Sequence, residues 1–500
     1  MSGKTNIEQN YHVYFLFFIF CSLIILYPQN FTELFYYDDN TIRYMIAKLW
    51  VEGKLSREEK LFFLAYGSAE IYIPFFYFAK ILKVSNYELV YNFVSLFLFL
   101  IASSLFYHST LKKKIQGYIT FPFYLIFGIV CMKKGSLHWF IASSIFMHSI
   151  ISERISNKQK FLLWFAYLIS PPLVISSVLF CIIFLLKWEK KRAVDLLLPF
   201  LFTFPKYVLV SEITILEVKK SLYASEKFGR EVIGETKSFA PPVPSVFLRP
   251  VVLDYFDNKV LGLVVYLILA RALFTEDRQS LFVFILFYVF SFVSIFIFDI
   301  WKKGAHIPDL VISILSFFFT SNPFRYIPIF VIYFVMRSEE TKYDNILLVF
   351  IILSFIASGI WVLVNQKGEL PAKVPDEVKL VIRYINESEA EKILVEGDTH
   401  MLEKGKLIHP LYGAHIMSYI AAEADNKKFY GGVIPWELYK YNFFAGRFKY
   451  KPIESSDILE FISKNSINLV LCWTEACEKF FWKQGKKIVK FGKIKVVELR

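Results

Sequence analysis

This chain has few cysteines and lacks the common short motifs for metal and phosphate binding. Its 500 residues include five cysteines, and none of them stands in a zinc-type spacing. The sequence has no Gly-rich phosphate loop, no Ser-His-Asp order and no internal repeat. These absences argue against a zinc finger, a P-loop nucleotide-binding protein and a repeat array, and long apolar runs remain as the main feature.

Apolar residues make up 56% of the chain, and aromatic residues make up 19%. A soluble protein of this length would rarely be so apolar, because its surface must be mostly polar. Apolar runs of membrane length recur from Tyr11 to Val364. The sequence therefore predicts an integral, multi-pass protein of the cell membrane, with about ten to twelve membrane helices in residues 1–365. No small-residue cleavage site follows the first run, so we expect that run to be retained as a span.

Basic residues predict which loops face the cytoplasm. The net charge is +13, and short loops rich in Lys and Arg, at 112–114, 154–160 and 187–192, flank apolar runs. Such loops favour the cytoplasmic side, and they lack the interleaved aromatics of a base-stacking surface, so no nucleic-acid partner is expected. Two longer polar loops, residues 28–87 and 211–257, then lie on the outer face.

The topology stays open in two segments. Residues 161–186 are long enough for one span, but Pro171-Pro172 and the basic flanks favour a hairpin of two short helices. The number of crossings within residues 301–336 is also undecided.

The composition changes after Asn365 to a mixed-charge pattern typical of a soluble domain. Strands are expected at Lys392–Glu396, Ile467–Trp473 and Lys493–Leu499, and amphipathic helices at Asp376–Asn386 and Ser456–Lys464. This alternation predicts a small α/β domain over residues 366–500. Counting the spans places it outside the membrane, where Cys472 and Cys477 could pair. The predicted fold is therefore mainly α, with a polytopic helical membrane domain and a C-terminal extracytoplasmic α/β domain.

Two adjacent carboxylates, Asp38 and Asp39, open the first outer loop. At least one of them is a candidate general base, but Asp39 could instead cap the helix that starts at Thr41. Arg43, one turn later, either binds a phosphate or pairs with Asp39 on the same helix face. Other candidates for contact with substrate or metal could equally be ordinary loop or core residues: Glu70, Tyr72 and His138.

Three parts of the sequence resemble GT-C type glycosyltransferases. The first is the acidic pair followed by Tyr72-Ile73-Pro74-Phe75-Phe76-Tyr77, and the second is the segment Asn322–Pro328, which contains Arg325-Tyr326. The third comprises residues 393–398, 409–415 and 430–432, which resemble the exported tail of a prokaryotic branch labelled as membrane proteins related to 6-pyruvoyl-tetrahydropterin synthase. GT-C enzymes span the membrane many times and take a sugar from a polyprenyl-phosphate carrier on the extracytoplasmic side.

The resemblance implies a mechanism and a set of roles. Transfer would invert the sugar carbon, with Asp39, or Asp38 beside it, taking the acceptor proton. The donor phosphate would be held by side chains that can stabilise its charge: Arg325, Arg43 and Tyr326. A divalent cation, Mg²⁺ or Mn²⁺, could assist, and the acceptor would be a glycan, a lipid or a protein.

Two alternatives come from other classes of protein. One is a transporter or flippase for a lipid-linked glycan, and the other is a non-catalytic assembly protein. Transporters tend to show internal repeats and charged residues at mid-depth in their spans. This sequence shows no repeat and almost no such charge, which favours the enzyme.

Overall fold

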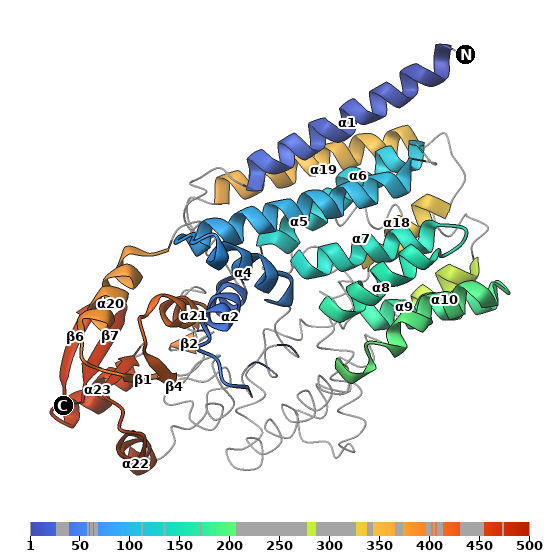
Figure 1. Cartoon of the computed structure of the whole chain (residues 1–500). Helices are drawn as coiled ribbons and strands as arrows, with labels where there is room; N and C mark the ends of the chain where they lie inside the picture. The colour runs from blue at the N-terminus through green and yellow to red at the C-terminus, as the bar shows by residue number, and fades with distance from the viewer. Residues whose placement is uncertain are drawn as a thin grey trace.

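The chain folds mainly into helices, with a five-stranded sheet near the C-terminus (Figure 1). The computed structural model describes the following residues: 2–26, 40–57, 60, 64, 69–111, 114–133, 137–170, 173–206, 278–286, 327–337, 344–365, 374–396, 402–403, 406–407, 414–430, 455–472 and 475–499.

The predicted apolar runs form helices wherever they fall in these ranges. Before the sheet the elements are α1 (Ser2–Leu26), α2 (Asn40–Glu52), η1 (Ala69–Ile71), α4 (Ile73–Ile81), α5 (Tyr87–Thr110), α6 (Lys114–Lys133), α7 (Leu137–Ile151), α8 (Asn157–Ile169), α9 (Leu173–Leu186), α10 (Lys190–Leu201), α18 (Ile327–Arg337) and α19 (Asp344–Asn365).

These helices pack side by side into a bundle (Figure 1). Helix α6 contacts α1, α5 and α19, and α7 contacts α5 and α8. Helices α6 and α7 approach each other closely at Gly128 of α6. A Cβ added at this glycine would lie 2.5 Å from the ring of Phe140 on α7, so a side chain does not fit there. Tyr124, fully buried on α6, donates a hydrogen bond to the Phe140 carbonyl at 3.0 Å. Aromatic packing and buried hydroxyl contacts thus join α6 to α7.

One helix in the described part of the chain, α5, is long and apolar enough to cross a membrane. Shorter apolar helices occur at Tyr11–Ile24, Leu137–Ile151, Ser176–Leu186, Pro328–Arg337 and Asn345–Ala357. Large apolar side chains on several helices point outward, among them Leu16, Phe17 and Phe20 of α1, and Phe93 and Phe97 of α5.

Residues 161–186 contain two helices on either side of the proline pair, whereas their return to one side of a membrane stays a prediction. Helix α8 ends at Ile169, and α9 begins at Leu173. Ser177 of α9 donates a hydrogen bond to the Tyr167 hydroxyl of α8 at 2.6 Å, and Tyr167 donates to the Leu196 carbonyl of α10 at 3.0 Å. Helices α8 and α9 are therefore fixed to each other and to α10.

The C-terminal sheet has the strand order β4-β1-β5-β7-β6. Strands β1 (Lys392–Val395), β4 (Lys428–Tyr430) and β5 (Leu469–Cys472) run parallel, whereas β6 (Lys487–Phe491) and β7 (Ile494–Glu498) pair antiparallel at the other side. The other elements here are α20 (Asp376–Glu387), the β2 (Leu402–Glu403) and β3 (Lys406–Leu407) pair, α21 (Ala414–Glu423), α22 (Ser455–Asn465) and α23 (Glu475–Lys483).

Helix α21 of this C-terminal part packs against α2 of the bundle (Figure 1). Glu423 accepts a hydrogen bond from the Tyr44 hydroxyl at 2.6 Å, and the Lys48 ammonium lies 2.8 Å from the same carboxylate oxygen. Tyr419 of α21 donates to Glu88 at the start of α5. The C-terminal part is thus attached to the helix that follows Asp38 and Asp39.

Candidate functional site

The start of α2 is anchored deep in the bundle. Asn40 is 3% exposed, and its amide donates to the Met132 carbonyl near the end of α6 at 3.1 Å. The Tyr91 hydroxyl of α5 donates to the Asn40 side-chain oxygen at 2.9 Å. Because Asn40 is the covalent neighbour of Asp39, the proposed catalytic segment joins the folded core at this point.

Residues far apart in the predicted first loop meet beside α2. Arg43 of α2 is 6% exposed, and its positive charge acts on both Glu70 of η1 and Tyr72, which precedes α4. The sequence named these three residues as candidates without predicting that they meet. The structure brings them together.

A fourth residue, Lys206, completes this arrangement from beyond the end of α10. Its ammonium forms an ion pair with the Glu70 carboxylate and also donates to the Leu168 carbonyl of α8. The Glu70 and Lys206 side chains are 15% and 11% exposed. We call Arg43, Glu70, Tyr72 and Lys206 the Glu70 cluster; it joins the first loop to α8 and α10.

Burial has the largest effect on the pKa of Glu70 in this cluster. Loss of solvent raises the pKa of the Glu70 carboxyl, and the charges of Lys206 and Arg43 counteract part of this effect. One Glu70 oxygen, Oε2, is buried without a hydrogen-bond partner among the described residues. The three ionisable side chains of the cluster thus comprise one carboxylate and two cations, of which Lys206 forms the ion pair.

Tyr72 is held rigidly at the rim of the cluster. Its ring stacks on Tyr91 with centroids 4.3 Å apart, and its hydroxyl lies 3.1 Å from the Ser95 hydroxyl. The stack links Tyr72 to the residue that also binds Asn40. The start of α2 and the Glu70 cluster therefore share one packed support.

The remaining predicted site residues stand as follows. His138 is 5% exposed in the first turn of α7, and its role in a site stays a prediction. Four candidates lie outside the described residues: Asp38, Asp39, Arg325 and Tyr326.

A divalent cation does not fit the Glu70 cluster. A metal ion at the Glu70 carboxylate would face the positive charges of Lys206 and Arg43, which disfavour a further cation. We therefore assign neither Mg²⁺ nor Mn²⁺ to this cluster. Within the described ranges, one group of three potential ligands comes together, and it lies in the C-terminal domain: Glu396, Cys472 and Cys477.

No family model, curated protein or solved structure matches this chain.

The sequence did not single out Lys206, because the residue stands in an apolar stretch just before the second polar loop. A lysine in such a run costs free energy unless it finds a partner, and this was the signal that could have identified it. The partner, Glu70, is 136 residues away in the sequence, so no local pattern reveals the pair.

The raised pKa of Glu70 predicts a pH-dependent stability. The native state holds the Glu70 proton more tightly than the unfolded chain, in which the pKa is near 4.5. The free energy of unfolding should therefore fall as the pH rises from about 4.5 through the raised pKa. In Glu70→Gln the contribution of this group to the pH profile should be absent, and the fall should be smaller than in wild type. Thermal midpoints of the purified protein in detergent, compared between about pH 4 and pH 8, check this. Equal slopes in wild type and Glu70→Gln would contradict it, and exposed Glu475→Gln is the control.

Proposed function

We propose that this chain is an integral, multi-pass membrane glycosyltransferase of the GT-C type. It transfers a sugar from a polyprenyl-phosphate carrier to a hydroxyl of a glycan, lipid or protein acceptor on the extracytoplasmic face. The observation that carries the proposal is the Glu70 cluster, in which the Glu70 carboxylate pairs with Lys206 and also feels the charge of Arg43, on the helix that follows Asp39.

The chemistry assigns complementary tasks to the two parts of the first loop. Asp39 or Asp38 takes the proton of the acceptor hydroxyl while its oxygen bonds to the anomeric carbon of the sugar. The bond from that carbon to the phosphate oxygen breaks, and the carrier phosphate leaves with the electron pair. Arg43 supplies positive charge for that phosphate, because a guanidinium can hold two phosphate oxygens at once.

Contact between α2 and α21 supports the assignment of sides. Two segments that touch through Tyr44, Lys48 and Glu423 must lie on the same side of a membrane. This agrees with a topology that places both the first loop and the C-terminal domain outside. A disulfide between Cys472 and Cys477 fits the same assignment, since disulfides persist in oxidising compartments.

An apolar cavity that is open at the surface of the bundle supports a lipid-linked donor. It has a volume of about 510 Å³ and lies between α8 and α10, lined by Lys160, Phe161, Trp164, Leu198, Pro199 and Phe202. Along α8, Phe161 is roughly 10 Å from Leu168, whose carbonyl binds Lys206. A prenyl chain in this cavity could therefore reach the cluster with its phosphate end.

The proposal is tested by following sugar transfer from a defined donor. Membranes containing the wild-type chain should move label from polyprenyl-phosphate-linked radioactive hexose or pentose into an envelope fraction. Arg43→Gln should raise the KM for the donor by at least about tenfold, because it removes a charged hydrogen-bond donor from the phosphate. Lys48→Gln is the matched control on the same helix, since Lys48 binds Glu423 of α21 instead.

Two results would contradict the proposal. The first is the absence of transfer from every hexose and pentose donor, with correctly folded protein. The second is movement of the intact lipid-linked sugar between leaflets without transfer, which would favour a flippase.

A further inference from the structure

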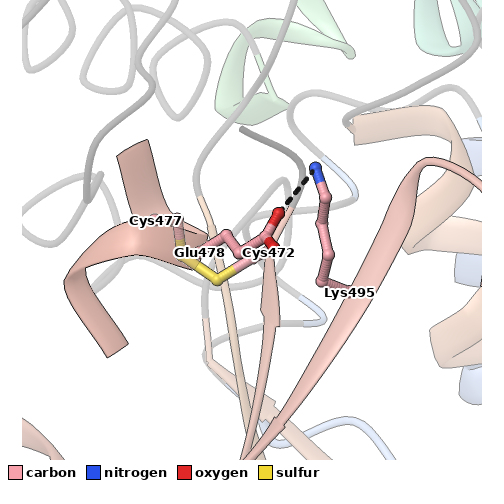
Figure 2. The surroundings of a disulfide bond; sticks show 4 residues. All are labelled: Cys472, Cys477, Glu478 and Lys495. Carbon is pink, nitrogen blue, oxygen red and sulfur yellow. Dashed lines mark ion pairs between the residues drawn. A yellow bond between two sulfur atoms is a disulfide. The ribbon is translucent and has the colours of Figure 1, made fainter. Parts of the chain in front are cut away.

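The C-terminal domain contains a second group of chemically active side chains, away from the Glu70 cluster. Cys472 ends β5, and Cys477 lies in the first turns of α23. The two form a disulfide, with their Cα atoms 5.7 Å apart (Figure 2). Glu396 follows β1, and its backbone N–H donates to the Leu471 carbonyl at 2.9 Å, which places Glu396 beside Cys472 across the sheet.

All three side chains are buried. Cys472 is 0% exposed, and Cys477 and Glu396 are each 1% exposed. The two sulfur atoms and a Glu396 carboxylate oxygen lie within 4.8 Å of one another. The fold thus places three side chains that can bind a metal ion at one buried point, beside the end of β5.

We infer that reduction of the disulfide converts these residues into a Zn²⁺ site, with Cys472, Cys477 and Glu396 as ligands. Two thiolates and a carboxylate are a ligand set that zinc accepts. The inference does not depend on the transferase activity, and it requires that a dithiol reductant reach the C-terminal domain.

The observed geometry is close to what zinc needs. With Zn–S bonds of about 2.3 Å and tetrahedral angles, two coordinating sulfurs stand about 3.8 Å apart, and a sulfur and a carboxylate oxygen about 3.5 Å apart. A Cα separation of 5.7 Å lets the sulfurs separate to that distance by side-chain rotation. The carboxylate oxygen, already within 4.8 Å of both sulfurs, needs to move by roughly 1 Å.

The surroundings favour the charged form of the site. The early turns of α23 present the positive end of a helix dipole to Cys477, which stabilises a thiolate. Lys495 lies opposite Cys472 in the β5–β7 pairing, and its ammonium is 3.8 Å from Glu478 (Figure 2). Zn²⁺ with two thiolates and one carboxylate carries one net negative charge, and the ion pair of Lys495 with Glu478 adds no net charge beside it.

The redox step balances with an added dithiol as the reductant. A dithiol reductant gives two electrons and two protons to the disulfide, forms its own disulfide, and leaves two protein thiols. Binding of Zn²⁺ then releases the two thiol protons to solvent as the two Zn–S bonds form.

The experiment uses the full chain in detergent. After reduction with a phosphine, which takes up the oxygen of water, the protein is incubated with Zn²⁺, freed of excess metal and analysed for bound zinc. We expect about one zinc per reduced chain and only background binding in the oxidised chain. Co²⁺ in place of Zn²⁺ should give a thiolate-to-metal absorption band, which reports directly on sulfur ligation.

Variants assign the ligands. Cys472→Ser should abolish zinc binding. Glu396→Gln should weaken zinc affinity by at least about tenfold, because losing even a residue that only hydrogen-bonds to a ligand weakens metal affinity by that factor. Glu478→Gln is the matched control, because Glu478 is the neighbour of Cys477 but pairs with Lys490 and Lys495. Cys181→Ser controls for the free cysteines, and both controls should bind zinc as wild type does.

Equal zinc in reduced and oxidised wild type would overturn the inference. Wild-type affinity in Glu396→Gln would remove Glu396 from the ligand set and overturn the site as stated. Circular dichroism of each reduced variant shows whether the chain is still folded. Should Glu396→Gln unfold, Glu396→Asp, which keeps a carboxylate on a shorter stem, should fold and bind zinc more weakly than wild type. Wild-type affinity in that variant would count against the site.

Discussion

Replacing Lys206 with Met should lower the free energy of unfolding by about 3–5 kcal/mol, the typical cost of breaking a buried ion pair from one side. The variant leaves the Glu70 carboxylate, 15% exposed, without its ion-pair partner. Lowering the pH should reduce this deficit, because Glu70 then takes up a proton and no longer needs a cation. Thermal or denaturant unfolding of the purified chain, at neutral and mildly acidic pH, measures both effects.

Two controls separate this effect from a general loss of packing. In Glu70→Gln/Lys206→Met, both charges are gone, and the double variant should be more stable than Lys206→Met alone. Lys479→Met removes an exposed ion pair with Glu475, whose side chains are 71% and 58% exposed, and should cost less than about 1 kcal/mol. A double variant that is no more stable than Lys206→Met would show that the ion pair is not the source of the loss.

Most of the secondary structure follows from short-range patterns. The apolar runs gave helices, the proline pair gave a helix break between Ile169 and Leu173, and three strands were placed within a few residues of β1, β5 and β7. Strands β4 and β6 were missed because they are short or lie at the edge of the sheet. A strand with alternating Lys residues, such as Lys487–Phe491, satisfies the period of a strand but carries little hydrophobic signal.

The site was predictable in its parts, whereas its assembly was not. Arg43 was a candidate because it follows the acidic pair by one helical turn, and Glu70 and Tyr72 were candidates because they lie in or beside the segment that resembles the GT-C loop. Their meeting with Lys206 depends on how α2, η1 and α10 pack, and this packing is set by contacts far apart in the sequence. The docking of Glu423 on Tyr44 is similar, since 379 residues separate the two partners.

Changing Asp39 to Asn should reduce transfer from the polyprenyl-phosphate donor by about 10²–10⁴-fold, if Asp39 is the general base. The same change should hardly affect stability. Helix α2 begins at Asn40, so Asp39 is the residue immediately before it, and Asn caps a helix as well as Asp does. The Asn variant thus removes the base and keeps the capping function, and this distinguishes the two interpretations of the acidic pair.

Asp39→Ala completes the test, because it removes both functions. It should lose transfer to the same extent as Asp39→Asn and also cost about 1 kcal/mol of stability if Asp39 caps the helix. Asp38→Asn is measured in parallel, and loss of transfer in that variant alone would assign the base to Asp38. Full transfer in both Asn variants would remove the base from this pair. The Glu70 carboxylate, whose pKa is raised by burial and whose Oε2 has no hydrogen-bond partner among the described residues, would then be the next candidate for the proton acceptor.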